Sequence, residues 1–325
     1  VARLNLVSAL NLALDQEMAR NDRVVLLGED VGGEGGVFRV TEGLQDKYGP
    51  ERVVDTPLAE AGIVGAALGL SLGGMLPVPE IQFEGFLYPA LNQLCNHIAR
   101  YRTRTRGGRP VRLVLRCPWG GGIHAPEHHS DAPEALLAHT PGLTVVTPSN
   151  PYDAKGLLTA ALRHPDPVVF CEPKRIYRAI KQEVPEKEFL VPIGQAAVVR
   201  EGSDATVVAW GALVREALAA SDLLAGDGVS VEVIDLRTLA PLDAETVVAS
   251  AAKTGRVVVA HEAPRTCGLG AELSARVTEE ALVHLLAPVV RVTGFDTVVP
   301  LAKLEHHYLP GAKRIAAGVR RAMAF

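Results

Sequence analysis

One acidic residue opens a long uncharged stretch and is the first candidate for chemistry. Glu60 is followed by residues 61–74, none of which is charged, and Pro57 precedes it, where proline suits the first turn of a helix. The stretch is too short to span a bilayer, so we predict a helix buried in protein. At its start, Glu60 is either an exposed acid favoured by the helix dipole or a buried, functional carboxylate.

Glycine recurs on this predicted helix at spacings of three and four residues. Gly62, Gly65, Gly69 and Gly73 follow that pattern. Each glycine destabilises a helix by about 1 kcal/mol relative to alanine. We therefore predict that the helix packs closely against a neighbour, where larger side chains would not fit.

A histidine-rich loop is the second candidate. Within residues 117–131, His124, Glu127 and His128 match the H-x-x-E-H zinc motif. That motif needs a helix to bring both histidines to one face, and Pro126 together with the preceding glycines opposes a helix. The loop is better interpreted either as a solvated histidine loop or as a site of proton transfer, because histidine titrates near neutral pH.

Polar and aromatic residues lie at the ends of two predicted strands. Glu29 follows the strand predicted over residues 23–28, and residues 82–86 (QFEGF) lie at the end of the strand predicted over residues 76–83. Open α/β sheets bind ligands at the carboxyl ends of their strands. These residues are therefore candidates for ligand contact, although a phenylalanine such as Phe86, taken alone, more often belongs to a core.

Strand and helix patterns alternate along the chain, which predicts βαβ units and mostly parallel sheets. After an amphipathic helix near the N-terminus, strands are predicted at residues 23–28, 76–83, 111–116, 143–147, 167–171, 205–210, 230–235, 256–260 and 289–293, and helices at residues 86–106, 152–163, 213–225, 243–252, 270–286 and 311–324. The prediction is an α/β protein of two domains, residues 1–175 and 195–325, joined by a charged, proline-containing linker over residues 176–194.

Composition narrows the class of protein. The 325 residues are 48% hydrophobic and 22% charged, with a net charge of −4, which gives no reason to expect nucleic acid or an anionic membrane as a partner. No run of about 18 apolar residues predicts a membrane span. The 4 cysteines lie far apart without a C-x-x-C pair, and residues 1–20 resemble no targeting segment, so we expect a cytoplasmic rather than a secreted or mitochondrial protein.

Three short motifs resemble one enzyme family. They are DTPLAE at residues 55–60, the spacing from Glu60 to Gly65 and Gly69, and the HHS triplet at residues 128–130. They resemble the β subunits of 2-oxoacid dehydrogenase decarboxylating components, which depend on thiamine diphosphate. The resemblance covers nearly the whole chain and implies a transketolase-like pyrimidine-binding domain followed by a transketolase C-terminal-like domain.

The resemblance also implies roles for individual residues. Glu60 would activate the cofactor by protonating its aminopyrimidine ring, and His129 would assist proton transfer. The residues implied around the cofactor are Glu29, Leu58, Ala59, Glu60, Gln82 and Phe86, with Leu58 acting through its backbone and Phe86 by packing. The residues implied around the substrate are Phe83, Glu84, Gly85, Phe86 and His129. The roles of His124, Glu127 and His128 stay open.

The diphosphate and its metal need a site that this chain does not complete. In the family pattern G-D-G and a later asparagine hold Mg²⁺, but no asparagine follows residues 226–228 (GDG), because Asn150 is the last in the chain. The triplet is therefore predicted to be a turn. The resemblance implies that an α subunit holds the diphosphate and Mg²⁺ in an α₂β₂ heterotetramer, and no metal is assigned to this chain. A potassium ion near residues 111–114 and 161–166 is left open, because His164 stands where the family has aspartate.

The implied reaction is decarboxylation of a 2-oxo acid with acyl transfer to lipoamide on the dihydrolipoyl acyltransferase core. Residues 118–122 (PWGGG) and 260–273 (AHEAPRTCGLGAEL) resemble branched-chain enzymes most, so branched-chain 2-oxo acids are the predicted substrates. A pyruvate or acetoin dehydrogenase is the alternative of the same class. A non-catalytic assembly or regulatory subunit is opposed by the presence of both Glu60 and His129, and a self-sufficient thiamine transferase by the incomplete metal motif.

Overall fold

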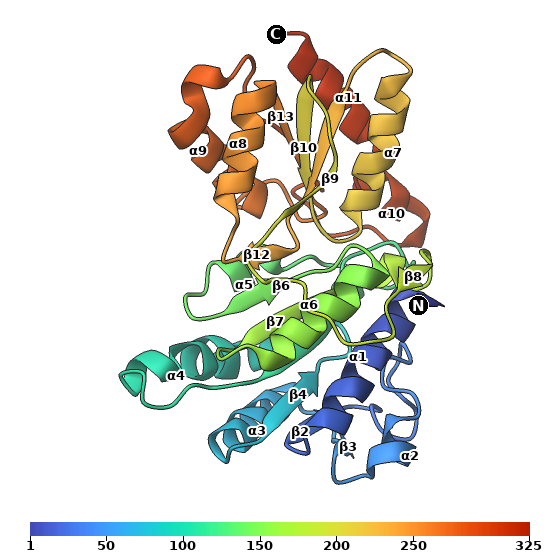
Figure 1. Cartoon of the computed structure of the whole chain (residues 1–325), viewed down its shortest axis with the longest axis vertical. Coiled ribbons are helices and arrows are strands. Elements are labelled where there is room, and N and C mark those ends of the chain that lie inside the picture. The colour runs from blue at the N-terminus through green and yellow to red at the C-terminus, as the bar shows by residue number, and fades with distance from the viewer. The chain divides into compact units, whose positions relative to one another are not determined.

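The computed structural model describes residues 1–325, and internal contacts divide the chain into two compact units (Figure 1). The first unit comprises Val1–Trp119 and Leu136–Ile193, and the second comprises Gly120–Ala135 and Gly194–Phe325. The short helix α5 (Glu134–Ala138) begins in the second unit and ends in the first.

The sheet of the first unit is parallel and largely buried. Its strands lie in the order β6-β7-β5-β4-β2-β3. They are β2 (Val24–Gly28), β3 (Val53–Asp55), β4 (Leu76–Glu80), β5 (Val114–Trp119), β6 (Thr144–Val146) and β7 (Val168–Pro173). Every strand except β3 is buried along its whole length, which explains the continuous apolar runs, because helices cover both faces of a parallel sheet. Gly28 is paired with Glu80, so the residues that follow β2 and β4 meet at one edge.

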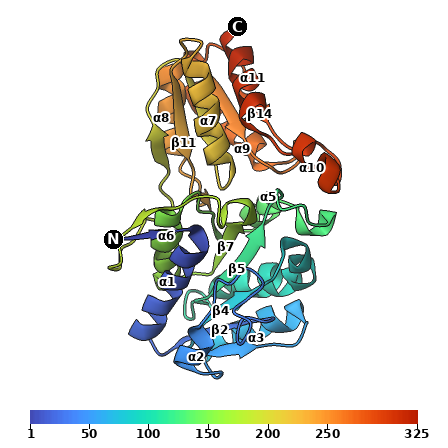
Figure 2. The ribbon, with the colours of Figure 1, turned by 90° about the vertical axis from the view of Figure 1, so that its right-hand side faces the viewer.

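Helices cover both faces of this sheet. Helices α1 (Leu6–Arg20) and α6 (Pro151–Arg163) lie side by side on one face, and α3 (Glu60–Leu72) lies on the other (Figure 2). The other helical segments are α2 (Leu44–Tyr48), α4 (Ala99–Arg104), the 3₁₀ segments Glu84–Ala90 and Lys174–Ile176, and the π-helical segment Asn92–Ile98. A short antiparallel pair, β1 (Ala2–Leu4) and β8 (Gln182–Val184), completes the unit.

Local sequence explains where α1 and α6 begin. The side chain of Asn5 accepts a hydrogen bond from the backbone N–H of Ser8 at 2.9 Å, which caps the first turn of α1. Asn150 caps α6 in the same way through Asp153, also at 2.9 Å, and Pro151 occupies the first helical position, where no N–H is needed.

Two sequence predictions differ from the structure in this unit. The helix predicted over residues 86–106 is broken into 3₁₀, π and α segments, and Pro89 lies inside the first of them, where it supplies no backbone donor. The predicted linker contains β8, and the carbonyls of residues 185–187 accept hydrogen bonds of 2.6, 3.0 and 2.8 Å from Nζ of the buried Lys155. Those bonds tie the segment to α6.

The second unit has a smaller sheet in the order β14-β13-β10-β11-β9, in which only β9 is antiparallel. Its strands are β9 (Ala197–Arg200), β10 (Ala205–Ala209), β11 (Val231–Asp235), β13 (Val257–Ala260) and β14 (Val290–Val292), and the short β12 (Thr238–Ala240) follows β11. Its helices are α7 (Leu213–Ala225), α8 (Ala244–Thr254), α9 (Leu269–Ala281), α10 (Ala302–Tyr308) and α11 (Ala312–Met323), with 3₁₀ turns at Glu127–His129 and Leu282–His284.

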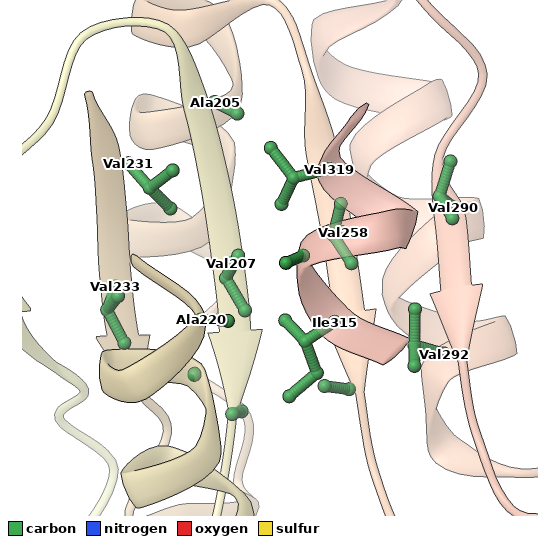
Figure 3. Close-up of a cluster of buried hydrophobic side chains, with 14 of the residues drawn as sticks. Ala205, Val207, Ala220, Val231, Val233, Val258, Val290, Val292, Ile315 and Val319 are labelled. Carbon is green, nitrogen blue, oxygen red and sulfur yellow. The ribbon is translucent and has the colours of Figure 1, made fainter. Parts of the chain in front are cut away.

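The core of this unit lies between the sheet and the helices α7 and α11, while α8 and α9 cover the opposite face (Figure 1). In Figure 3, Ile315 and Val319 of α11 lie beside Val258 of β13 and Val292 of β14. All four side chains are buried, and burying such a side chain contributes about 1.5–3 kcal/mol. A β-carbon at Gly318 would lie 2.6 Å from Val292, so glycine allows α11 to approach the sheet closely.

Candidate active site

Two carboxyl groups come together in the first unit. Glu60 is the first residue of α3 and Glu29 follows β2, and they expose only 8% and 7% of their surface. Burial raises the pKa of Glu29, and the negative charges of Glu60 and Asp30 raise it further. Within the first unit, no hydrogen-bond donor or cation is paired with the Glu60 carboxylate. The oxygens of this carboxylate are not among the fully buried unpaired atoms, so they can accept a hydrogen bond from a ligand.

Gln82 is bonded to the segment that carries Glu29. Its amide Nε2 donates to the carbonyl oxygen of Glu29 at 3.4 Å and to Oδ2 of Asp30 at 2.9 Å. We call Glu29, Glu60 and Gln82 the carboxylate cluster. The structure therefore brings together three of the residues that the sequence predicts around the cofactor.

The neighbouring aromatic residues form a second layer of the site. The half-buried Phe83 and Phe86 meet edge to face, with ring centroids 6.2 Å apart and planes at 89°. Glu84 between them is fully buried and forms an ion pair with Lys174, whose Nζ lies 5.4 Å from the ring centroid of Phe83. The carboxylate of Glu84 is therefore held inside the unit, while Gly85 is half-buried.

A buried charge network that the sequence analysis missed lies beneath the strand ends. The Arg116 guanidinium donates from Nε and Nη2 to both carboxylate oxygens of Glu172, at 2.7 and 2.9 Å, and pairs also with Glu80. Tyr177 donates its hydroxyl to Glu172 at 2.7 Å. Bidentate pairs of this kind fix geometry, and Glu80 is the last residue of β4, two residues before Gln82. The sequence contained a signal for this network, because each of three apolar strand segments carries one charged residue at or near its end.

The turn before α3 and one face of α3 are open. Leu58 exposes 78% of its surface, and Ala59 is also exposed. The glycine face of α3 is likewise uncovered: a β-carbon at Gly69 would meet no atom within 4 Å, and Gly62 is exposed. The opposite face packs on β4 through residues such as Ile63. The helix is therefore not buried all round, and the close packing that its glycines predict is not made within the first unit.

The histidine loop, which we define as residues 120–131, belongs to the second unit. Only Glu127–His129 form a short 3₁₀ turn, so His124 and His128 do not share the helix face that the zinc motif requires. No group of three or more metal-ligating side chains occurs in the structure. His129 is half-buried, its backbone N–H donates to the carbonyl of Pro126 at 2.9 Å, and its ring centroid lies 4.1 Å from that of His128.

Buried ionisable groups that the sequence analysis missed lie near this loop. Glu134 is fully buried, and Nε1 of Trp210 donates to it at 3.4 Å. Burial raises the pKa of Glu134 to about 8, and the negative charge of Glu262 contributes. His261 stacks on Trp210, with centroids 5.2 Å apart and planes at 16°, and burial lowers its pKa to about 4. At neutral pH Glu134 is therefore mostly protonated and His261 is neutral.

The GDG triplet at residues 226–228 forms a turn between α7 and β11, as the sequence predicts. Oδ2 of Asp227 accepts hydrogen bonds from Nε and Nη2 of Arg320 at 3.0 and 2.7 Å. Its carboxylate therefore takes part in a surface ion pair of this unit.

Both units match known protein families. Residues 2–180 match the family described as "Transketolase, pyrimidine binding domain", and residues 194–315 match "Transketolase, C-terminal domain". Over 321 residues the chain is 55% identical to pyruvate dehydrogenase E1 component subunit beta of Acholeplasma laidlawii, which covers 99% of this chain and 98% of that protein. The protein of the same name from Bacillus subtilis is 47% identical over 325 residues, which cover 100% of both chains.

The chain belongs to the E1 β-subunit family of thiamine-dependent 2-oxoacid dehydrogenases. A solved structure, "Split gene transketolase, inactive beta4 tetramer", resembles it with a TM-score of 0.82 at 26% identity, over 99% of each chain. The predicted fold, two transketolase-like α/β domains, is confirmed.

This E1 β chain is a subunit of an oxidoreductase, the 2-oxoacid dehydrogenase complex, so the predicted enzyme class is confirmed. The predicted branched-chain specificity is not supported, because the relatives named above are pyruvate dehydrogenase subunits. In agreement with the sequence, none of its helices is both long and apolar enough to cross a membrane.

Proposed function

We propose that this chain is the β subunit of a pyruvate dehydrogenase and that pyruvate, rather than a branched-chain 2-oxo acid, is its substrate. The support is the shared name of relatives that are 47% and 55% identical over nearly the whole chain. The two segments that favoured a branched-chain enzyme have local structural partners here. Gly121 donates its N–H to Glu262 at 3.1 Å, and His261 stacks on Trp210.

We infer that thiamine diphosphate binds with its aminopyrimidine end at the carboxylate cluster. The observation that carries this inference is the buried Glu60 carboxylate, which has no donor within its unit and lies near a second acid. A protonated ring nitrogen is a donor that fits such a carboxylate. The residues that would hold this end are Glu60, Glu29 and Gln82 by polar contact, Phe86 by packing, and Leu58 and Ala59 through their backbone.

Thiamine diphosphate, when bound, supplies the electron sink for decarboxylation, and the chain's own residues control position and protons. Glu60 is proposed to hold and deliver the proton at the aminopyrimidine ring nitrogen. Burial and the neighbouring charges of Glu60 and Asp30 raise the pKa of Glu29, which makes its neutral form easier to reach. Phe83 and Phe86 are proposed to exclude water beside the substrate, with Glu84 and Gly85 shaping that segment.

His129 is proposed to carry the proton that acyl transfer to the lipoyl group of the acyltransferase core requires. Its ring is half-buried, and an imidazole can both accept and donate a proton, which suits this task. The 3₁₀ turn Glu127–His129 sets the direction of its side chain.

An α subunit is proposed to complete the site and to hold the diphosphate and Mg²⁺ in an α₂β₂ assembly. Three observations support a partner. Asp227 is used in a surface ion pair, the glycine face of α3 and Leu58 are open, and the similar β4 tetramer is named inactive. The potassium ion near residues 111–114 stays an open expectation.

Substrate preference tests the proposal directly. In the enzyme assembled from this chain and its α subunit, we expect kcat/KM for pyruvate to exceed that for 3-methyl-2-oxobutanoate by at least about tenfold, since extra methyl groups change binding by such factors. Both substrates are measured in one preparation by reduction of an artificial electron acceptor, and the Glu60→Gln assembly serves as the blank. A preference for the branched substrate would restore the sequence prediction.

A further inference from the structure

Two buried carboxylates hold the backbone of the histidine loop. Glu305 lies on α10 with 2% of its side chain exposed, and Glu262 follows β13 and exposes 5% of its surface. Both belong to the same unit as the loop. Burying a carboxylate is unfavourable unless hydrogen-bond donors compensate it. The donors that bind these two acids therefore indicate the role of each acid.

Glu305 accepts two backbone hydrogen bonds from the loop and lies against one histidine ring. Its Oε1 accepts the backbone N–H of Gly122 at 2.6 Å, and its Oε2 accepts the backbone N–H of His124 at 3.1 Å and pairs with Nδ1 of His124 at 3.0 Å. Bonds to an ionised acceptor are about twice as strong as those between neutral groups. Glu305 therefore clamps the first half of the loop.

Glu262 holds the residue before this clamp. Its Oε2 accepts the N–H of Gly121 at 3.1 Å, and a β-carbon at Gly120 would lie 2.8 Å from the same oxygen. The N–H of Gly120 donates to the carbonyl of Asp131 at 2.9 Å, which closes the loop at its base. The two ends of the loop and its first half are thus fixed, and the turn that carries His129 lies between them.

The conformation that the clamp holds is not one that the chain adopts freely. His124 has φ 60° and therefore lies in the left-handed region, which non-glycine residues rarely occupy, and Gly120 and Gly122 have φ 80° and 96°. A residue persists in that region only when its surroundings fix it. The carboxylate of Glu305 provides such surroundings, because it binds both the backbone and the ring of His124.

We propose that Glu305 and Glu262 are positioning residues that keep the histidine loop in the conformation in which His129 transfers protons. This inference rests on the proposed role of His129. Neither acid needs to touch substrate. Displacing a reacting group by about 1 Å can reduce a rate about 100-fold, so loss of the clamp is expected to lower the rate by displacing His129.

The test measures the effect of Glu305→Gln on the rate of lipoyl acylation in two backgrounds, one with His129 and one with His129→Ala. The glutamine keeps the size of the side chain, but an amide nitrogen replaces one carboxylate oxygen. That nitrogen cannot accept the backbone hydrogen bond that the oxygen accepted. In the assembled enzyme, with pyruvate and a free lipoyl domain, we expect the kcat of lipoyl acylation to fall about 10- to 100-fold. In the His129→Ala background, the same substitution should cause no further fall, because the two residues act as one unit.

Controls separate this inference from the role of His129 itself. Glu279→Gln changes an exposed glutamate on α9 and should leave the rate unchanged. If Glu305→Gln impairs assembly, Glu262→Gln is compared in the same way, alone and in the His129→Ala background. A tenfold loss that persists in the His129→Ala background, or no loss at all, overturns the positioning role. If His129→Ala alone leaves lipoyl acylation intact, the proposed function of His129 fails instead.

Discussion

Replacing Glu60 with glutamine is expected to slow the assembled enzyme by about 10²- to 10⁴-fold, the usual contribution of a positioned acid. Glutamine keeps the shape of the side chain, but it has no proton to give to the aminopyrimidine ring. Since only the proton is lost, fold and assembly should be unchanged. The measurement is deuterium exchange at the thiazolium carbon of the bound cofactor, followed by NMR after acid quenching, which reports cofactor activation without any substrate.

The matched control for this variant is Glu51→Gln, which changes an exposed glutamate of the same unit. It should exchange deuterium at the normal rate. The substitution at Glu60 also removes a negative charge that raises the pKa of Glu29, so the pKa of Glu29 should fall in that variant. If deuterium exchange in the Glu60→Gln assembly is as fast as in wild type, Glu60 does not activate the cofactor and is an ordinary residue at the start of a helix.

Replacing His129 with alanine is expected to lower the activity of the whole complex by about 10²- to 10⁴-fold. Decarboxylation measured with an artificial electron acceptor should fall less. The reason is that decarboxylation relies mainly on the cofactor, whereas opening the lipoyl disulfide needs a proton, and the artificial acceptor bypasses that step. The two assays on one preparation therefore separate the steps.

The neighbouring histidines provide the comparison for this variant. His124→Ala and His128→Ala should each lose less complex activity than His129→Ala, although Nδ1 of His124 lies 3.0 Å from Oε2 of Glu305 and His128 packs on the His129 ring. The zinc interpretation of the loop would be restored by a different pattern. In that pattern a chelator abolishes activity, both of these variants lose activity, and His129→Ala stays nearly normal.

Local sequence was sufficient for most of the fold and for the first half of the site. Apolar runs such as Val24–Gly28 and Val257–Ala260 predict buried parallel strands because their whole length is covered. Glu60 could be named as a candidate because its signal lies within a few consecutive residues, and its contact with the cofactor stays a prediction. Short elements such as α10 (Ala302–Tyr308) were missed because one or two turns leave too weak a periodic pattern.

The supports of the site were not predictable, because their partners lie far apart in the chain. Glu305 and Gly122 are separated by 183 positions, and Arg116 and Glu172 by 56. No periodicity or motif links such residues, and only the folded chain brings them together. The predicted branched-chain specificity rested on two short segments, and it is not supported by the relatives, which are named as pyruvate dehydrogenase subunits.

This chain is proposed to provide only the aminopyrimidine half of a thiamine diphosphate site. Titration calorimetry with thiamine diphosphate and Mg²⁺ measures that claim, first on the purified chain and then on the chain assembled with its α subunit. We expect no tight binding to the chain alone, because no metal site is formed by its own residues, and at least micromolar binding to the assembly. Micromolar binding to the lone chain would contradict the shared site.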